Sequence, residues 1–187
     1  MKKLIIDTSH ERSFVAFAEG VNILLNLALP FGFQSSSFLF PAIQSGFQKL
    51  NLTPSDLEEV AVVVGPGSFT GIRVGVAAAK GIAFPKQLPL TGLCSLYGFT
   101  NQKDEVAFID AKIGGAFILI PGEAPRLVSQ NDFPHVLKGN RVIVGPNLQR
   151  FSFPNQIERN PDPISLITHP VFVKKKDLQM LYLRETV

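Results

Sequence analysis

The two halves of this sequence contain the same pair of short segments in the same order, and this repetition restricts the possible fold more than any other feature. The segment "IIDTSHERSFVAF" (5–17) aligns with "FIDAKIGGAFILI" (108–120), and "VVVGP" (62–66) aligns with "VIVGP" (142–146). In the second half these two segments lie closer together than in the first half, by roughly the length of one helix. We therefore expect a duplicated lobe whose second copy is shortened.

The first half carries strand and helix patterns in the order βββαβα, which is typical of one lobe of an α/β protein. Apolar runs predict the strands, and apolar residues at helical spacing predict the helices. The run "VAVVV" (60–64) has no polar alternation, so it predicts a strand covered on both faces. The other predicted elements are strands at 2–7, 13–20, 21–29 and 88–93, a helix within 35–51 and a helix at 69–84.

Proline and capping signals set the expected helix starts in this half. Pro41 fits a helix best in its first turn, where N–H groups have no intrahelical partner, so we place the start at about Ser36 or Ser37. Ser55 and Glu58 stand three residues apart. This spacing predicts a capping box for a helix of one or two turns.

A polar segment, "TNQKDE", separates the two copies around residue 101. It predicts an N-terminal lobe at 1–100, which carries the long helices, and a shortened, degenerate C-terminal lobe at 101–187. Two prolines and several polar residues occupy 145–156, after the second glycine anchor. No counterpart of the helix at 69–84 is therefore expected there.

The composition is that of a globular protein. Hydrophobic residues make up 45% of the chain and charged residues 18%, which suits a buried core. The net charge of +3 does not define a nucleic-acid face, and we expect the lysines at 174–176 to be solvated. The tail at 177–187 is apolar enough to dock. The N-terminal apolar run stops at Asp7 and no run approaches a bilayer span, so we expect a cytoplasmic protein.

The stretch "GPGSFTGIRVG" (65–75) follows a predicted strand and opens a predicted helix, where backbone N–H groups can bind a phosphate. It does not match the usual phosphate loops. A Walker loop needs lysine after its second glycine, whereas isoleucine and arginine follow Gly71. A dinucleotide-binding loop needs a third glycine at the position where this sequence has Thr70. A phosphate contact at Gly67 and Ser68 stays open as an alternative.

Small residues recur every four positions through this stretch, at Gly67, Gly71, Gly75 and Ala79. In a helix they form one stripe that is almost free of side chains. Each interior glycine costs about 1 kcal/mol relative to alanine, and the close approach of another backbone would offset that cost. The neighbour is either another helix of this chain or a second chain, with Phe69, Ile72 and Val76 beside the stripe.

Histidine and cysteine offer no recognisable catalytic or metal-binding motif. His10, His135 and His169 are far apart, without the HxxxH spacing that places two imidazoles on one helix face. This argues against a metalloprotease. Cys94 is the only cysteine, so no internal disulfide can form, and no histidine stands near it in the sequence.

Asp7 and Asp110 each end a predicted strand at the head of a lobe. A magnesium ion bound to a nucleotide could sit between them. The alternative is that each caps its own turn, since neither is followed by a glycine-rich hairpin.

These motifs resemble the bacterial TsaB (YeaZ) family, the shortened, non-catalytic relatives of TsaD within the actin-like, sugar-kinase-like (ASKHA) ATPase fold. The central glycine stretch is the most specific part of the resemblance, and the second half is weak outside its anchors. The resemblance rests on "IIDTS" (5–9), the segment 39–84, "PLTGLCSL" (89–96), "IDAKIGG" (109–115) and "LYLR" (181–184).

The resemblance implies a scaffold function rather than an enzyme. Family members take part in forming N6-threonylcarbamoyladenosine next to the anticodon of tRNAs that read codons beginning with A. TsaD carries the metal and transfers the threonylcarbamoyl group, and the ATPase TsaE joins the complex. The implied partners are TsaD, TsaE and a second copy of this chain, with tRNA reached through the complex. No cofactor is implied for this chain alone.

The family's dimers use helices of the N-terminal lobe, so the resemblance places an interface on the helix that opens at Gly67 and on its neighbour. On this interpretation Gly71→Leu or Gly75→Leu would abolish the complex. The predicted interface comprises Ile43, Phe47, Gly67, Ser68, Phe69, Thr70, Gly71, Ile72, Arg73, Val74, Gly75, Val76 and Ala79.

An enzyme is the second hypothesis: a small ATP-binding phosphotransferase that uses Asp7, Asp110 and the turn at 65–67. The weak nucleotide-binding candidates are therefore Asp7, Gly67, Ser68 and Asp110. This hypothesis predicts nucleotide binding that is lost in Asp7→Ala.

Overall fold

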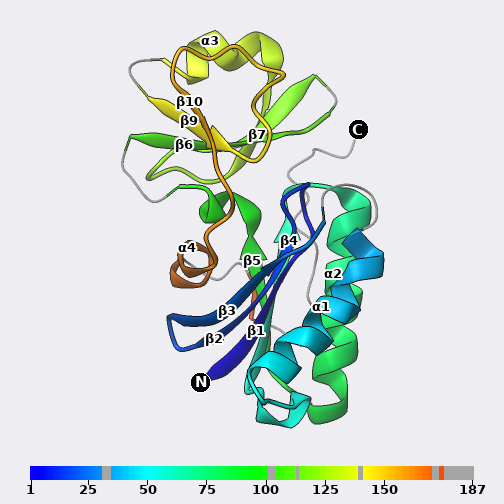
Figure 1. Ribbon diagram of the computed structural model, residues 1–187. Coiled ribbons are helices and arrows are strands. Elements are labelled where there is room, and N and C mark those ends of the chain that lie inside the picture. Colours follow the sequence, from blue (N-terminus) through cyan, green and yellow to red (C-terminus); the bar gives the residue numbers. More distant parts are fainter. Residues whose placement is uncertain (31–34, 101–103, 113, 139–140, 170–172, 175–187) are drawn as a thin grey trace.

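Two β-sheets, one above the other in Figure 1, organise the chain into two α/β lobes. This two-lobed architecture confirms the predicted fold class. The structure is a computed structural model that describes residues 1–30, 35–100, 104–112, 114–138, 141–169 and 173–174.

The first sheet has six strands in the order β11-β5-β4-β1-β2-β3. β1 pairs antiparallel with β2, which follows it through a short turn, and parallel with β4, which returns after helix α1. The strands are β1 (Lys2–Asp7), β2 (Phe14–Glu19), β3 (Asn22–Ala28), β4 (Glu59–Gly65), β5 (Leu90–Cys94) and β11 (Val173–Lys174).

Helices cover both faces of this sheet. The long helices α1 and α2 lie side by side on one face, and the short helix α4 lies on the other (Figure 1). The helical elements of this lobe are α1 (Ser35–Lys49), η1 (Pro54–Asp56), α2 (Phe69–Ala83), η2 (Phe84–Lys86), η3 (Ser95–Gly98) and α4 (Pro163–Thr168).

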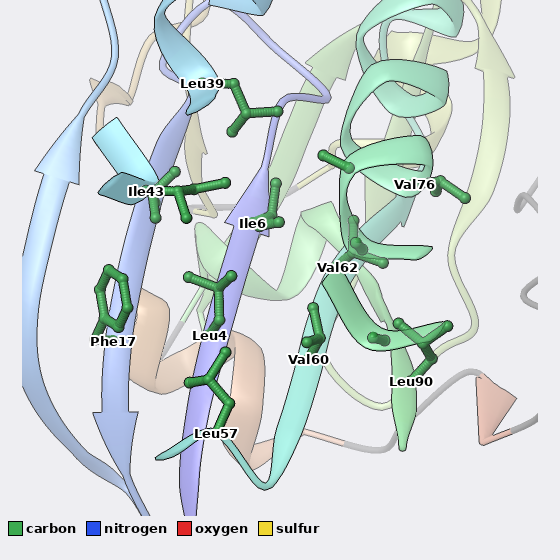
Figure 2. Close-up of a cluster of buried hydrophobic side chains, with 14 of the residues drawn as sticks. Leu4, Ile6, Phe17, Leu39, Ile43, Leu57, Val60, Val62, Val76 and Leu90 are labelled. Carbon is green, nitrogen blue, oxygen red and sulfur yellow. The ribbon is translucent and has the colours of Figure 1, made fainter. Parts of the chain in front are cut away.

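The central strands pack against both helical layers because side chains alternate along a strand. Ile6 and Val62 belong to the cluster beneath α1 and α2 that Figure 2 shows. Ile5 and Val63 belong to the cluster on the opposite face, with Leu166 of α4. Every residue of β4 is buried, which confirms the prediction for "VAVVV".

The second sheet repeats the topology of the first. Its order is β10-β9-β6-β7-β8, and β6 is antiparallel to β7 and parallel to β9, as β1 is to β2 and β4. This match confirms the duplication that was predicted from the sequence. The elements are β6 (Glu105–Asp110), β7 (Gly115–Leu119), β8 (Arg126–Ser129), η4 (Gln130–Asp132), α3 (Phe133–Val136), β9 (Val142–Gly145) and β10 (Gln156–Glu158).

The second lobe is also shortened where the sequence predicted it. Between β8 and β9 the helix α3 spans 4 residues, whereas α1 of the first lobe spans 15. Residues 146–155, which link β9 to β10, form no helix. Within the residues that the structure describes, the second lobe therefore has no counterpart of the long helices of the first.

Two local predictions were wrong. Pro41 lies inside α1 rather than in its first turn, where it has no N–H to donate to the carbonyl of Ser37, an exposed residue. The capping box of η1 is formed by Thr53 and Asp56 instead of Ser55 and Glu58. Glu58 instead accepts a hydrogen bond from the backbone N–H of Lys2 at 2.6 Å, so tertiary contact and not the local spacing decided its role.

After the second lobe the chain returns to the first, where β11 pairs with β5. Lys174 ends β11, whereas the other two predicted surface lysines and the tail at 177–187 lie outside the described residues. The division into 1–100 and 101–187 stays a prediction.

Candidate interaction surface and interlobe contacts

The glycine turn before α2 is docked onto the turn that follows β1. Gly65 and Gly67 have φ of 130° and 150°, a backbone region that side chains rarely adopt. The N–H of Ser68 donates to the carbonyl of Ser9 at 2.6 Å, and the Ser68 hydroxyl caps α2 by accepting from the N–H of Gly71 at 3.2 Å. A Cβ on Gly67 would lie closer than 3.0 Å to the Ser9 oxygen. The N–H of Ser68 is thus already bound by a carbonyl of the same chain and is not free to bind a phosphate.

The stripe of small residues on α2 packs within the chain. A Cβ on Gly71 would lie closer than 3.0 Å to the carbonyl oxygen of Thr8, and one on Gly75 equally close to the Thr8 hydroxyl. That hydroxyl donates to the carbonyl of Gly71 at 2.7 Å, and Ala79 is fully buried. The prediction that a second chain covers the stripe was wrong, and so was the alternative of another helix. The covering element is the end of β1 and the turn after it.

The predicted interface residues consequently differ in their exposure to solvent. Whether any of them contacts a partner stays a prediction. Four are exposed, namely Ser68, Phe69, Thr70 and Arg73; Gly67, Gly71 and Val74 are half-buried; Ile43, Phe47, Ile72, Gly75, Val76 and Ala79 are buried.

The side of α2 opposite the stripe is exposed, and we call it the outer face of α2. Phe69 is 50% exposed, and the guanidinium of Arg73 lies 3.5 Å from the centre of its ring. Phe84, just after the helix, is 63% exposed. An aromatic ring stacked by arginine is a common centre of protein interfaces. The outer face comprises Phe69, Thr70, Arg73, Ala77, Gly81 and Phe84.

Next to this face, an apolar groove of about 580 Å³ runs between α1, η1 and the end of α2. Phe40 stands at its edge and is 58% exposed. Ile43 and Phe47, two of the predicted interface residues, line the groove from the core. Sequence reasoning missed Phe40, although an aromatic residue directly before Pro41 in an amphipathic helix was a usable signal. The groove is lined by Phe40, Ile43, Gln44, Phe47, Gln48, Asn51, Leu52, Pro54 and Ile82.

Asp7 is fully buried and caps its own turn. Its carboxylate accepts from the N–H and the hydroxyl of Ser9 at 2.9 and 2.7 Å, and Nε2 of His10 lies 2.9 Å away. Burial alone would raise the pKa of Asp7, but the charge and hydrogen bond of His10 and the bonds from Ser9 outweigh it, so the pKa lies below its ordinary value.

Asp110 occupies the equivalent position at the end of β6 and also caps its turn, accepting from the N–H of Lys112 at 2.8 Å. Arg150 donates to its other oxygen at 2.7 Å. Both aspartates therefore fit the turn-capping alternative. In the part of the chain that the structure describes, no three His, Cys, Asp or Glu side chains form a group that could hold a metal ion.

The turn between β1 and β2 also bridges the two lobes, a contact that sequence reasoning missed. Arg12 donates to the carbonyl of Pro146 at 2.6 Å and to the Glu158 carboxylate at 2.9 Å. Glu11 accepts from the side chain of Asn147 at 2.5 Å. Pro146 follows the second glycine anchor, so the turn between β1 and β2 in the first lobe contacts the turn after β9 in the second lobe.

Cys94 is a free, buried thiol at the end of β5. Burial raises the pKa of Cys94 to about 12. It therefore carries no thiolate at neutral pH, in agreement with the lack of a catalytic cysteine motif.

The sequence of this chain matches a protein-family model and several known proteins. The family model of TsaD, tRNA N6-adenosine threonylcarbamoyltransferase, matches residues 34–112. The TsaB proteins of Bacillus subtilis (strain 168) and Escherichia coli (strain K12), each named as a tRNA threonylcarbamoyladenosine biosynthesis protein, are 31% and 30% identical to this chain. The matches cover 51% and 63% of this chain and 42% and 53% of those proteins, so the chain spans about half the length of these relatives.

A crystal structure described as an uncharacterized protein with similarity to peptidase YEAZ from Pseudomonas aeruginosa has the same fold. Its TM-score is 0.75 at 19% identity, over 98% of this chain and 99% of that one. The fold is thus a two-lobed actin-like, sugar-kinase-like fold. The sequence matches show that the chain is similar to TsaB proteins, and the structural match shows a shared fold.

No helix within the described residues has the length and apolar character needed to cross a membrane.

Proposed function

We propose that this chain is a non-catalytic scaffold that binds TsaD, with TsaE, in the formation of N6-threonylcarbamoyladenosine in tRNA. The names of its TsaB relatives support the pathway. On this proposal ATP and metal are bound by the partners, and the chain reaches tRNA only through the complex.

The observation that carries the proposal is the exposed outer face of α2 beside the α1 groove. Phe69 and Phe84 leave large apolar surfaces open to solvent, and the groove continues this surface onto α1. Exposed apolar surface of this kind marks interaction sites. The segment that matches TsaD includes both helices, so the partner is expected to present a related helix pair. Related surfaces can pair in a pseudo-symmetric way, and a homodimer would then use the same face.

Contacts within the first lobe and between the lobes support a non-catalytic role. Asp7 is buried against His10, the N–H of Ser68 is bound to Ser9, and Arg12 joins the two lobes. The groups that a phosphotransferase would need for nucleotide and magnesium are thus engaged with other groups of the same chain. Nothing in this geometry favours the phosphotransferase hypothesis.

We expect Phe69→Ala or Arg73→Ala to weaken binding to the cognate TsaD by about 10- to 100-fold, because aromatic and arginine side chains at an interface centre each contribute about 1–3 kcal/mol. Biolayer interferometry with purified TsaD would measure this. Ile164→Ala is the matched control, since Ile164 is 44% exposed but lies on α4, across the sheet from α2.

Equal binding by wild type, Phe69→Ala and Arg73→Ala would show that TsaD uses another surface. A wild-type chain that fails to bind TsaD would refute the scaffold function itself. Saturable binding of ATP to the wild type, lost in a folded Asp7 variant, would favour the phosphotransferase instead.

A further inference from the structure

Arg73, on the outer face of α2, is exposed and forms no salt bridge within the residues that the structure describes. Its guanidinium lies 3.5 Å from the centre of the Phe69 ring. A ring stacked on the flat side of a guanidinium leaves the N–H groups along its edge able to bind a carboxylate. The arginines that do pair with carboxylates of this chain are Arg12, Arg126, Arg150 and Arg159.

The helical layer around Arg73 contains cations but no carboxylate. α1, α2 and η2 together include four lysine or arginine residues and neither aspartate nor glutamate. Lys49 and Lys80 lie in the last turns of α1 and α2, where the helix dipole favours a cation. Arg73 lies in the second turn of α2, where the dipole gives no such stabilisation. The electrostatics of the helices therefore explain these two lysines but not Arg73.

Helical spacing places Arg73 and Lys80 on the same side of α2 as two exposed aromatic rings, Phe69 and Phe84. These rings are 50% and 63% exposed. The apolar groove between α1, η1 and the end of α2 adjoins this side of the lobe. The surface thus offers apolar contact area together with positive charge.

We propose that the outer face of α2 binds a protein surface on which at least one Asp or Glu stands among apolar side chains, and that this carboxylate pairs with Arg73. The inference rests on the proposed function and specifies the chemistry that the partner must present. The planar fork of a guanidinium matches the two oxygens of a carboxylate. Apolar contacts around the pair exclude water and strengthen the charge-assisted bond.

Two other occupants fit this surface less well. RNA would supply anionic oxygens for Arg73, but it has no apolar side chains to fill the adjoining groove. A second copy of this chain that used the same face would bring cations onto both sides of the contact, and like charges oppose association. An acidic and apolar protein surface satisfies both features at once.

The salt dependence of TsaD binding tests the proposal. In biolayer interferometry at about 50 mM NaCl, we expect Arg73→Glu to bind about tenfold more weakly than Arg73→Met, because its carboxylate would face a like charge. At about 500 mM NaCl this difference should shrink severalfold through screening. Arg126→Glu makes the same change of charge on the second lobe, so it should bind like the wild type.

Zero-length crosslinking identifies the acidic residue directly. A carbodiimide joins an amine to a carboxylate that it contacts. In Arg73→Lys the introduced amine should become linked to an Asp or Glu of TsaD, which mass spectrometry of the digested complex would locate. Arg126→Lys is the matched control, and it should become linked to Glu123 of its own chain.

The outcomes separate this inference from the proposed function. A wild-type chain that fails to bind TsaD refutes both. Wild-type binding with equal affinities of Arg73→Glu and Arg73→Met at low salt refutes the acidic partner alone. Binding of tRNA by the chain alone, lost in Arg73→Glu, would assign the face to RNA and overturn the proposal. Should Arg73→Glu fail to fold, a wild-type affinity for TsaD that does not fall with salt overturns it instead.

Discussion

Gly71→Ala is expected to lower the free energy of unfolding by about 3 kcal/mol or more. The added methyl group would lie closer than 3.0 Å to the carbonyl oxygen of Thr8, which belongs to the backbone and cannot rotate away. Overpacking a well-filled interior costs about 1–3 kcal/mol, and more against a rigid atom. Urea denaturation followed by circular dichroism would measure the change.

Gly81→Ala is the matched control, because it makes the same change in the same helix. A Cβ on Gly81 meets nothing within 4 Å, so the variant should gain about 0.5–1 kcal/mol from the higher helix propensity of alanine. If both variants were equally stable, α2 would not pack on the turn after β1 as described.

This contrast changes how the interface can be tested. Gly71→Leu would disrupt the first lobe itself, so a lost complex would say nothing about where TsaD binds. Substitutions on the outer face of α2, such as Arg73→Ala, avoid this problem because the side chain they remove is exposed.

Asp7→Ala is expected to destabilise the protein by about 3 kcal/mol, because it leaves His10 and the hydroxyl of Ser9 without their buried partner. Asp110→Ala removes the equivalent carboxylate of the second lobe. Its partner Arg150 is 61% exposed, so this substitution should lower the free energy of unfolding by no more than about 1 kcal/mol. Chemical denaturation of both variants would measure the difference. Equal losses would contradict the burial of Asp7.

The contribution of Asp7 should also depend on pH. The pKa of Asp7 is lowered in the folded state. Its contribution to the free energy of unfolding is therefore complete above the unfolded-state pKa of about 3.9, and it is lost as the pH falls through the folded-state pKa. The stability difference between wild type and Asp7→Ala should therefore shrink below about pH 4. A difference that grew on acidification would contradict the lowered pKa.

Much of the fold could be predicted from the sequence because the signals were local or repeated. The apolar run at 60–64 could only be a buried strand, and the predicted strand at 2–7 and helix at 69–84 agree with β1 and α2. The matched anchors predicted two lobes of the same topology. The starts of α1 and η1 were less well predicted, because Pro41 is tolerated at an exposed position and Glu58 is held by a distant backbone group.

The candidate site was less predictable because a pattern shows what a surface can accept but not what covers it. The glycine spacing correctly required a close neighbour for α2, but it could not distinguish a second chain from the turn at Thr8 and Ser9. The interlobe bridge of Arg12 joins residues more than a hundred positions apart, which no periodicity reveals.

The sequence alone determined the duplicated α/β architecture, the shortened second lobe and the need for a backbone close to the stripe on α2, because strand burial, helix periodicity and glycine spacing are properties of neighbouring residues. Only the tertiary structure decided which face of α2 is open and that the turn after β1 covers the other face. Exposure and pairing depend on which distant segments the fold brings together, and one sequence of side chains is compatible with many such arrangements until the backbone is placed.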